Sequence, residues 1–161
     1  MRVAIAGGTG FVGRALTGAL LNEGHEVIIL TRRLNESSNN KRLTFLEWLP
    51  EGKDTIKKLE NLDAFINLAG ESLNSGRWTE KRKQIILHSR LETTNAVISI
   101  IKQLTLKPKV LINASAIGIY GTSRTETFTE ETIQTGSDFL AETVRLWEEK
   151  ALVAEVLGIR T

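Results

Sequence analysis

The sequence contains no cysteine, only two histidines and two prolines, and its charges nearly cancel. Without cysteine, disulfide scaffolds, thiolate nucleophiles and Cys-ligated zinc are excluded, and two histidines leave little for a metal centre, so we expect no metal. The 21 Lys and Arg against 19 Asp and Glu give a formal charge of +2. Because this excess is too small to mark a concentrated basic face, we expect neither a nucleic-acid nor a membrane partner.

Long apolar runs are also missing, whether of signal-peptide or of membrane-spanning length. The default expectation is a cytoplasmic protein. The 161 residues are 41% hydrophobic, which suits one globular domain with a core of its own and leaves no room for a second full domain.

What the sequence does contain is an alternation of strand-like and helix-like patterns over residues 1–31. The runs 2–6 and 27–30 are short and apolar, as expected of buried strands. Between them, apolar residues recur at spacings of three and four, which predicts an amphipathic helix with the stripe Val12, Ala15, Leu16, Ala19 and Leu20. A strand, a helix and a second strand form a βαβ unit, whose right-handed crossover makes the two strands parallel.

The alternation continues along the rest of the chain. Further strands are predicted over 43–46, 64–68, 110–114 and 159–161, and helices over 55–59, 79–104 and 137–158. Thr79 and Ser137 are the expected N-caps of the last two helices. This order predicts an α/β fold, a Rossmann-type doubly wound parallel sheet with helices on both faces.

A glycine-rich turn separates the first strand from the first helix. It reads Gly7-Gly8-Thr9-Gly10-Phe11-Val12-Gly13 and fits both G-x-G-x-x-G and G-x-x-G-x-x-G. A pyrophosphate can approach a helix N-terminus only where no Cβ intervenes, and there it meets unpaired N–H groups and the positive end of the helix dipole. No Gly-Lys-Ser or Gly-Lys-Thr follows, which argues against nucleoside triphosphate chemistry. The pattern indicates a dinucleotide site, and the alternative is a tight turn without a ligand.

The second strand ends in Thr31-Arg32-Arg33. A site that prefers NAD would carry Asp or Glu there to bind the ribose 2′-hydroxyl, whereas arginine complements a 2′-phosphate. Arg32 follows Gly13 by 32 − 13 = 19 residues, near the separation of about 20 that such sites have. NADP(H) is therefore favoured over NAD(H). The alternative is that both arginines only solvate the strand end.

Several separated motifs carry a family resemblance. They are 63–70 (DAFINLAG), Glu71, Arg77-Trp78-Thr79, 89–94 (SRLETT), 115–121 (SAIGIYG) and 138–141 (DFLA) with Trp147-Glu148. In this order, and over essentially the whole chain, the sequence resembles the extended short-chain dehydrogenase/reductases of the epimerase/dehydratase type. It resembles more specifically the atypical "epimerase family" proteins, sometimes labelled cell-division-inhibitor-like.

The resemblance implies a set of cofactor contacts. By it, the pyrophosphate meets the glycine turn, the 2′-phosphate meets the end of the second strand, and Ser115 lies near the nicotinamide. Glu71, Arg77 and Arg90 would be polar groups on the rim of the site, with surface salt bridging as the alternative. The cofactor-binding residues are Gly7, Thr9, Gly10, Phe11, Val12, Gly13, Thr31, Arg32, Arg33, Leu68, Ala69, Gly70 and Ser115.

The proton-transfer residues of the wider family are missing. That group uses a tyrosine whose pKa is lowered by a lysine four residues later, together with a Ser or Thr hydroxyl. Tyr120 is the single tyrosine, and Arg124 stands four residues beyond it. The helix that normally carries Y-x-x-x-K begins instead with residues 139–143 (FLAET).

The remaining catalytic candidates are Ser115, Tyr120 and Asp138. Asp138 or Glu142 would act as acid or base from a helix start directed at the crevice, and the alternative for Ser137 and Asp138 is helix capping. Each of these candidates rests on its position alone.

Relatives of this type continue beyond the Arg-Thr of the sixth strand into a substrate domain. We therefore expect residues 1–161 to be an NADP-binding Rossmann domain with that second domain absent. An exposed sheet edge near 158–161 would favour a homodimer. Two functions stay open. One is an NADP(H)-dependent, nucleotide-sugar-epimerase-like oxidoreductase acting on a small, sugar-like molecule. The other is a non-catalytic NADP(H)-binding module that regulates a partner or senses redox state.

Overall fold

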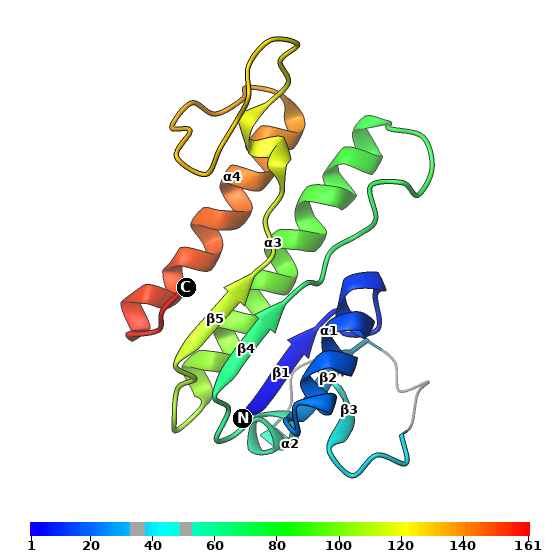
Figure 1. The fold of residues 1–161 in the computed structure, drawn as a ribbon, viewed down its shortest axis with the longest axis vertical. Coiled ribbons are helices and arrows are strands. Elements are labelled where there is room, and N and C mark those ends of the chain that lie inside the picture. The colour runs from blue at the N-terminus through cyan, green and yellow to red at the C-terminus, as the bar shows by residue number, and fades with distance from the viewer. Residues whose placement is uncertain (33–37, 49–52) are drawn as a thin grey trace.

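The chain folds into a five-stranded parallel sheet in the order β3-β2-β1-β4-β5 (Figure 1). The computed structural model describes residues 1–32, 38–48 and 53–161. The strands are β1 (Arg2–Ala6), β2 (Glu26–Thr31), β3 (Leu43–Glu47), β4 (Ala64–Asn67) and β5 (Val110–Asn113). The helices are α1 (Phe11–Asn22), α2 (Lys53–Lys58), α3 (Glu80–Gln103) and α4 (Phe139–Leu152), with 3₁₀ turns η1 (Ile117–Tyr120) and η2 (Val153–Leu157).

The direction of winding reverses at β1. From β1 the chain adds β2 and β3 on one side, and it then crosses back to add β4 and β5 on the other. Ala6 pairs with Leu30 of β2 and with Asn67 of β4, so the three strands end level with one another. In open α/β sheets such a reversal opens a crevice at the carboxyl ends of the strands, where ligands bind.

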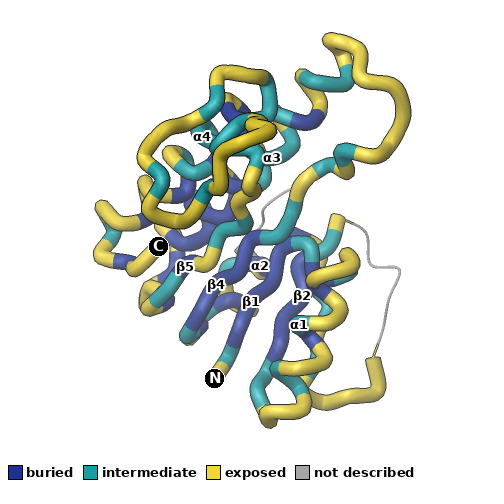
Figure 2. Tube along the Cα trace, turned by 45° about the horizontal axis from the view of Figure 1, so that its top comes forward, coloured by how far each residue is buried: buried dark blue, intermediate teal, exposed yellow. Residues whose placement is uncertain are grey.

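Both faces of the sheet are covered, as the sequence predicts. Side chains alternate along β1, so that Ala4 and Ala6 join a larger cluster with residues of α3, while Val3 and Ile5 join a smaller cluster against α1. Figure 2 shows the strands as the buried centre between exposed helix surfaces. The described helices include none that is long and apolar enough to cross a membrane.

The buried face of α1 differs from the predicted stripe. Leu16 and Leu20 pack on the sheet as expected, but Val12 is 60% exposed. Ala15 and Ala19 are exposed as well, and the helix buries Gly13 and Thr17 instead. The reason is that α1 approaches the β1–α1 turn through Gly13, which rotates the helix away from the orientation that hydrophobicity alone predicts.

The two longer helices begin at identifiable caps. The hydroxyl of Thr79 accepts from the Arg82 N–H at 3.2 Å, which confirms the predicted cap of α3. The prediction of Ser137 as the cap of α4 is wrong. The adjacent Asp138 has the extended backbone of an N-cap, and its carboxylate accepts from the Ala141 N–H at 2.9 Å.

The last residues run beside β5. Gly158, with φ of +76°, ends η2 in the left-handed conformation. Arg160 then forms a parallel bridge with Val110. The predicted start of a strand over 159–161 is therefore present as a single bridge at the edge of β5.

Candidate dinucleotide-binding cleft

A cleft of about 810 Å³ follows the carboxyl edge of the sheet around β1, β2 and β4. It contains eight residues that the sequence analysis assigns to the cofactor: Gly7, Thr9, Gly10, Thr31, Arg32, Leu68, Ala69 and Gly70. The remaining lining residues are Leu30, Phe45, Trp48, Glu71, Ser89 and Thr93. Segments from both sides of β1 thus meet at the point where the winding direction reverses.

Two glycines are required by the geometry of the β1–α1 turn. Gly7 has φ of +81°, and a Cβ there would lie 2.8 Å from the Leu68 carbonyl carbon. A Cβ on Gly13 would lie 2.4 Å from the Gly7 carbonyl oxygen. Since real Cβ contacts are not this short, any side chain at either position would move the turn away from the end of β4 or push the helix off the turn.

The first turn of α1 directly follows Gly10, which lines the cleft, and it has backbone N–H groups without acceptors, although Phe11, Val12 and Gly13 themselves do not line the cleft. Its N-cap is Gly10, which offers no capping side chain, and the turn contains no acidic residue. Within the described part of the chain, the backbone N–H groups of Phe11, Val12 and Gly13 have no acceptor, whereas that of Arg14 bonds to the Gly10 carbonyl at 2.9 Å. Three free N–H groups at the positive end of a helix dipole form a site for an anion.

The end of β2 supplies the cationic side of the cleft. Arg32 lines it directly after Thr31, whose carbonyl oxygen accepts from the Trp48 N–H at 3.3 Å. This bond fixes the strand end against the residue that follows β3. Arg33, the second arginine of the predicted pair, lies outside the described residues.

A buried polar network holds the ends of β4 and β5 against the helices. The Asn67 side-chain amide donates to the Thr94 hydroxyl at 3.1 Å and to the Asn113 side-chain oxygen at 2.7 Å. The Trp147 indole N–H also donates to Thr94, at 3.0 Å. Asn67 and Thr94 are fully buried. The sequence analysis did not identify this network, although an asparagine closing an apolar strand is a sign of such a role.

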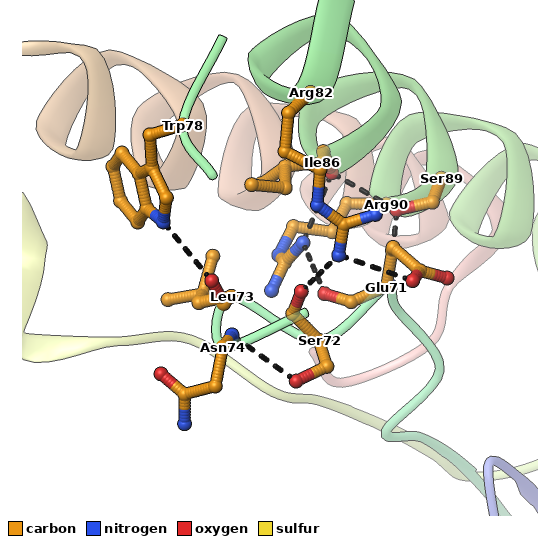
Figure 3. Close-up of polar contacts among 9 residues, drawn as sticks. All are labelled: Glu71, Ser72, Leu73, Asn74, Trp78, Arg82, Ile86, Ser89 and Arg90. Atoms are coloured by element: carbon orange, nitrogen blue, oxygen red, sulfur yellow. Dashed lines mark hydrogen bonds and ion pairs between the residues drawn. The ribbon is translucent and has the colours of Figure 1, made fainter. Parts of the chain in front are cut away.

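The segment after β4 is fastened to α3 by two arginines (Figure 3). Arg82 forms an ion pair with the Glu71 carboxylate, its Nη2 lying 3.1 Å from Oε1, and it also donates to the Ser72 carbonyl. Arg90 donates from Nη1 to the Glu71 carbonyl oxygen at 3.2 Å and to that of Ile86 at 2.9 Å. Salt bridging is therefore confirmed for Glu71, with Arg82 as a partner that the sequence analysis missed, while Arg77 is exposed.

Ser115 and Tyr120 lie in a second cavity, of about 660 Å³, and do not line the first. The Ser115 hydroxyl donates to the Glu148 carboxylate, which belongs to the same cavity. Tyr120 stacks on Phe128, with ring centroids 5.6 Å apart. Asp138 lines neither cavity and caps α4, so the structure brings together two of the three catalytic candidates.

The start of α4 has no tyrosine–lysine dyad. Phe139 packs edge-on against Trp78 at 6.1 Å, and the hydroxyl of the buried Thr143 donates to the Phe139 carbonyl at 2.7 Å. Hydrogen bonds from the Arg145 guanidinium hold the pKa of the Glu142 carboxyl below its ordinary value. Glu142 is therefore ionised at neutral pH and weakly basic, which makes it a poor proton donor.

Comparison with known proteins assigns the chain to a family. Residues 3–144 match the family model described as "NAD dependent epimerase/dehydratase family". The chain is 48% identical over 161 residues to "Epimerase family protein YfhF" of Bacillus subtilis, and 37% identical over 156 residues to a Staphylococcus haemolyticus protein named in the same way. It covers 52% and 51% of these proteins, so it spans about half the length of the curated relatives it matches.

Solved structures that resemble the chain are also described as epimerases or epimerase family proteins. The human epimerase family protein SDR39U1, described with NADPH, superposes with a TM-score of 0.74 at 32% identity, over 94% of this chain and 48% of that one. A nucleoside-diphosphate sugar epimerase from Corynebacterium glutamicum gives a TM-score of 0.75 at 35% identity, over 99% of this chain and 32% of that one. A UDP-glucuronic acid 4-epimerase from Bacillus cereus with NAD shares the fold at 18% identity.

Proposed function

The chain belongs to the NAD-dependent epimerase/dehydratase family, and we propose that it is an NADP(H)-binding short-chain dehydrogenase/reductase-type domain. The observation that carries this proposal is the set of three unfilled N–H groups at the start of α1, beside a cleft that Arg32 also lines. Phe11, Val12 and Gly13 would receive the diphosphate oxygens, and the absent Cβ atoms of Gly7 and Gly13 would keep the approach open.

The preference for NADP(H) over NAD(H) rests on Arg32. Its guanidinium would receive the 2′-phosphate in a charge-assisted hydrogen bond, where NAD-preferring sites place a carboxylate. The human relative is described with NADPH at 32% identity, whereas the structures described with NAD are about 18 to 20% identical and support the fold alone. Thr31, Leu68, Ala69 and Gly70 would form the walls beside the ribose groups.

The proposed chemistry is oxidoreduction or epimerisation of a small, sugar-like molecule. A bound nicotinamide would supply or accept the hydride. In this chain, the Ser115 hydroxyl and the Glu148 carboxylate it contacts would be placed to hold a proton near the end of β5. The missing tyrosine and lysine favour the second candidate function, a non-catalytic NADP(H)-binding module, for which the same cleft suffices.

Calorimetric titration of the chain with NADPH and with NADH tests the proposal. We expect NADPH to bind more tightly, and Arg32→Ala to lower NADPH affinity about tenfold or more while NADH affinity changes little, as for a lost hydrogen bond between charged groups. Arg145→Ala, on the exposed face of α4, is the matched control. Equal losses for both coenzymes would refute the 2′-phosphate assignment, and absence of binding would refute the function. Hydride transfer from NADPH to a panel of carbonyl compounds would separate the enzyme from the module.

A further inference from the structure

Arg90 is a half-buried cation enclosed between α3, α4 and the segment after β4. Its guanidinium lies 5.2 Å from the centroid of the Trp147 ring. Arg90 also borders Gly70, where a Cβ would lie 3.3 Å from the Arg90 Cγ and 3.4 Å from its Cζ. The bare backbone of Gly70 therefore lies within contact distance of the guanidinium, which Figure 3 shows beside Glu71.

This cation has hydrogen bonds but no carboxylate of its own. Both bonds leave from Nη1 and end on backbone carbonyls, those of Glu71 and Ile86. Within the described ranges, the N–H groups on Nε and Nη2 have no acceptor. The Glu71 carboxylate is engaged by Arg82 instead. A guanidinium carries five N–H donors, so Arg90 retains unused donors on two of its three nitrogens.

Arg145 on α4 is an arginine of the same molecule whose charge is paired with carboxylates, and it serves as a comparison for Arg90. Its guanidinium contacts two carboxylates, Glu142 at 2.6 Å and Glu149 at 2.5 Å. Arg145 is the more exposed and the better paired, whereas Arg90 is the more buried and has no ion pair. Burial lowers the pKa of Arg90, with only the more distant charge of Glu71 opposing it. Two carbonyl oxygens and the Trp147 ring support the Arg90 charge, and no carboxylate is bonded to it in the described part of the chain.

The position of Arg90 distinguishes it from the proposed cofactor phosphate sites. Gly10 and Arg32, at the proposed diphosphate and 2′-phosphate sites, follow β1 and β2, whereas Arg90 faces the segment that follows β4, on the opposite side of β1. Its neighbours Ser89 and Gly70 line that end of the cleft. Since Gly70 is also a proposed wall of the dinucleotide site, an anion at Arg90 would belong to a second molecule that lies against the dinucleotide, away from the two proposed phosphate sites.

We propose that Arg90, which packs on the Trp147 ring beside Gly70, binds an oxyanion group of the substrate, a carboxylate or a phosphate. The acceptor oxygens would fill the donors on Nε and Nη2 while Nη1 keeps its two backbone bonds. This inference rests on the proposed function and narrows its substrate to an anionic compound. A neutral sugar would leave the guanidinium unpaired.

The test observes the Arg90 Nε–H signal directly by ¹⁵N NMR, assigned by its loss in Arg90→Lys. The chain is first saturated with NADPH and then titrated with three probes: uridine diphosphate for the phosphate source, glucuronate for the carboxylate source, and glucose as the neutral control. We expect at least one anion to shift the Arg90 Nε–H signal saturably and glucose to leave it in place. The anion that binds more tightly, uridine diphosphate or glucuronate, identifies whether the oxyanion is a phosphate or a carboxylate.

Two variants complete the test. Arg90→Gln keeps a hydrogen-bonding side chain but no charge, and we expect it to weaken the effective anion about tenfold, as measured by backbone amide shifts around Gly70. Arg145→Gln should leave anion binding unchanged. NADPH affinity measured on Arg90→Gln reports whether the variant is folded and leaves the cofactor site intact.

Three results would overturn the inference. One is that neither anion shifts the Nε–H signal of the NADPH-bound chain. Another is that Arg90→Gln binds the effective anion as well as the unaltered chain does. The third is that NADPH alone shifts the signal and prevents any anion from doing so, because the charge at Arg90 would then be a cofactor phosphate. Failure of NADPH itself to bind is a separate result and counts against the proposed function.

Discussion

At the start of α1, three backbone N–H groups next to the cleft have no acceptor among the described residues, whereas at the start of α4 the side chains of Asp138, Glu142 and Thr143 already have partners. The first region is built from backbone, and glycine keeps it open. The second is built from side chains, and capping, ion pairing and backbone hydrogen bonds occupy them. The proposed anion binding needs only the α1 region, so it does not depend on the family's usual proton-transfer groups.

The largest effect on stability is expected when the lysine of the wider family's Y-x-x-x-K motif is introduced at position 143 of α4. Thr143 is 2% exposed, so Thr143→Lys would place an ammonium group in a buried position. We expect Thr143→Lys, alone or with Phe139→Tyr, to lower the free energy of unfolding by about 4 kcal/mol. Urea denaturation measures this, and Thr143→Val serves as the control for size. A Phe139→Tyr/Thr143→Lys chain as stable as its parent would show that the α4 region can still hold the dyad.

The corresponding change in the α1 region is Gly13→Ala. Its Cβ would lie 2.4 Å from the Gly7 carbonyl oxygen, so we expect a loss of about 3 kcal/mol in unfolding free energy and loss of NADPH binding. Gly18→Ala is the matched control, because it lies in the same helix with nothing within 4 Å of the added Cβ. That change should increase stability by up to about 1 kcal/mol. If Gly13→Ala bound NADPH as tightly as the parent chain does, this would contradict the proposed diphosphate site at the start of α1.

A smaller effect is expected where the two regions are joined. Thr94→Val removes the acceptor for both the Asn67 amide and the Trp147 indole, leaving two buried donors partly unsatisfied. We expect a loss of about 2 kcal/mol in unfolding free energy, and Thr94→Ser, which keeps the hydroxyl, should recover most of it. If Thr94→Ser were as unstable as Thr94→Val, packing of the methyl group would explain the loss instead of hydrogen bonding.

The smallest effect concerns the pH dependence of α4. The pKa of Glu142 is lower in the folded chain than in the unfolded chain, chiefly through its hydrogen bonds to Arg145. Its contribution to stability is therefore full above the ordinary glutamate pKa of about 4.3 and is lost as pH falls through the lowered value. In thermal melts, Glu142→Gln should lie slightly below the parent at neutral pH and converge with it in acid. Glu155→Gln, in η2, is the control. A difference that persists unchanged at low pH would contradict the ion-pair origin.

The contrast between the regions also decides what the sequence alone can predict. The β1–α1 turn, the Thr79 cap and the parallel β1–α1–β2 unit are local patterns, so neighbouring residues suffice to predict them. The orientation of α1 was missed because the fit of Gly13 against the turn outweighs the apolar stripe. The pairing of Glu71 with Arg82 and that of Ser115 with Glu148 depend on tertiary packing across 11 and 33 positions. No local pattern contains that information.

An amide ¹⁵N NMR titration of the chain with NADPH observes the proposed diphosphate donors directly. We expect saturable shifts of the Phe11, Val12 and Gly13 N–H signals with a common affinity, and no such shifts in Gly13→Ala. Binding of NADPH that left these three signals in place, or no binding at all, would contradict the proposed diphosphate site.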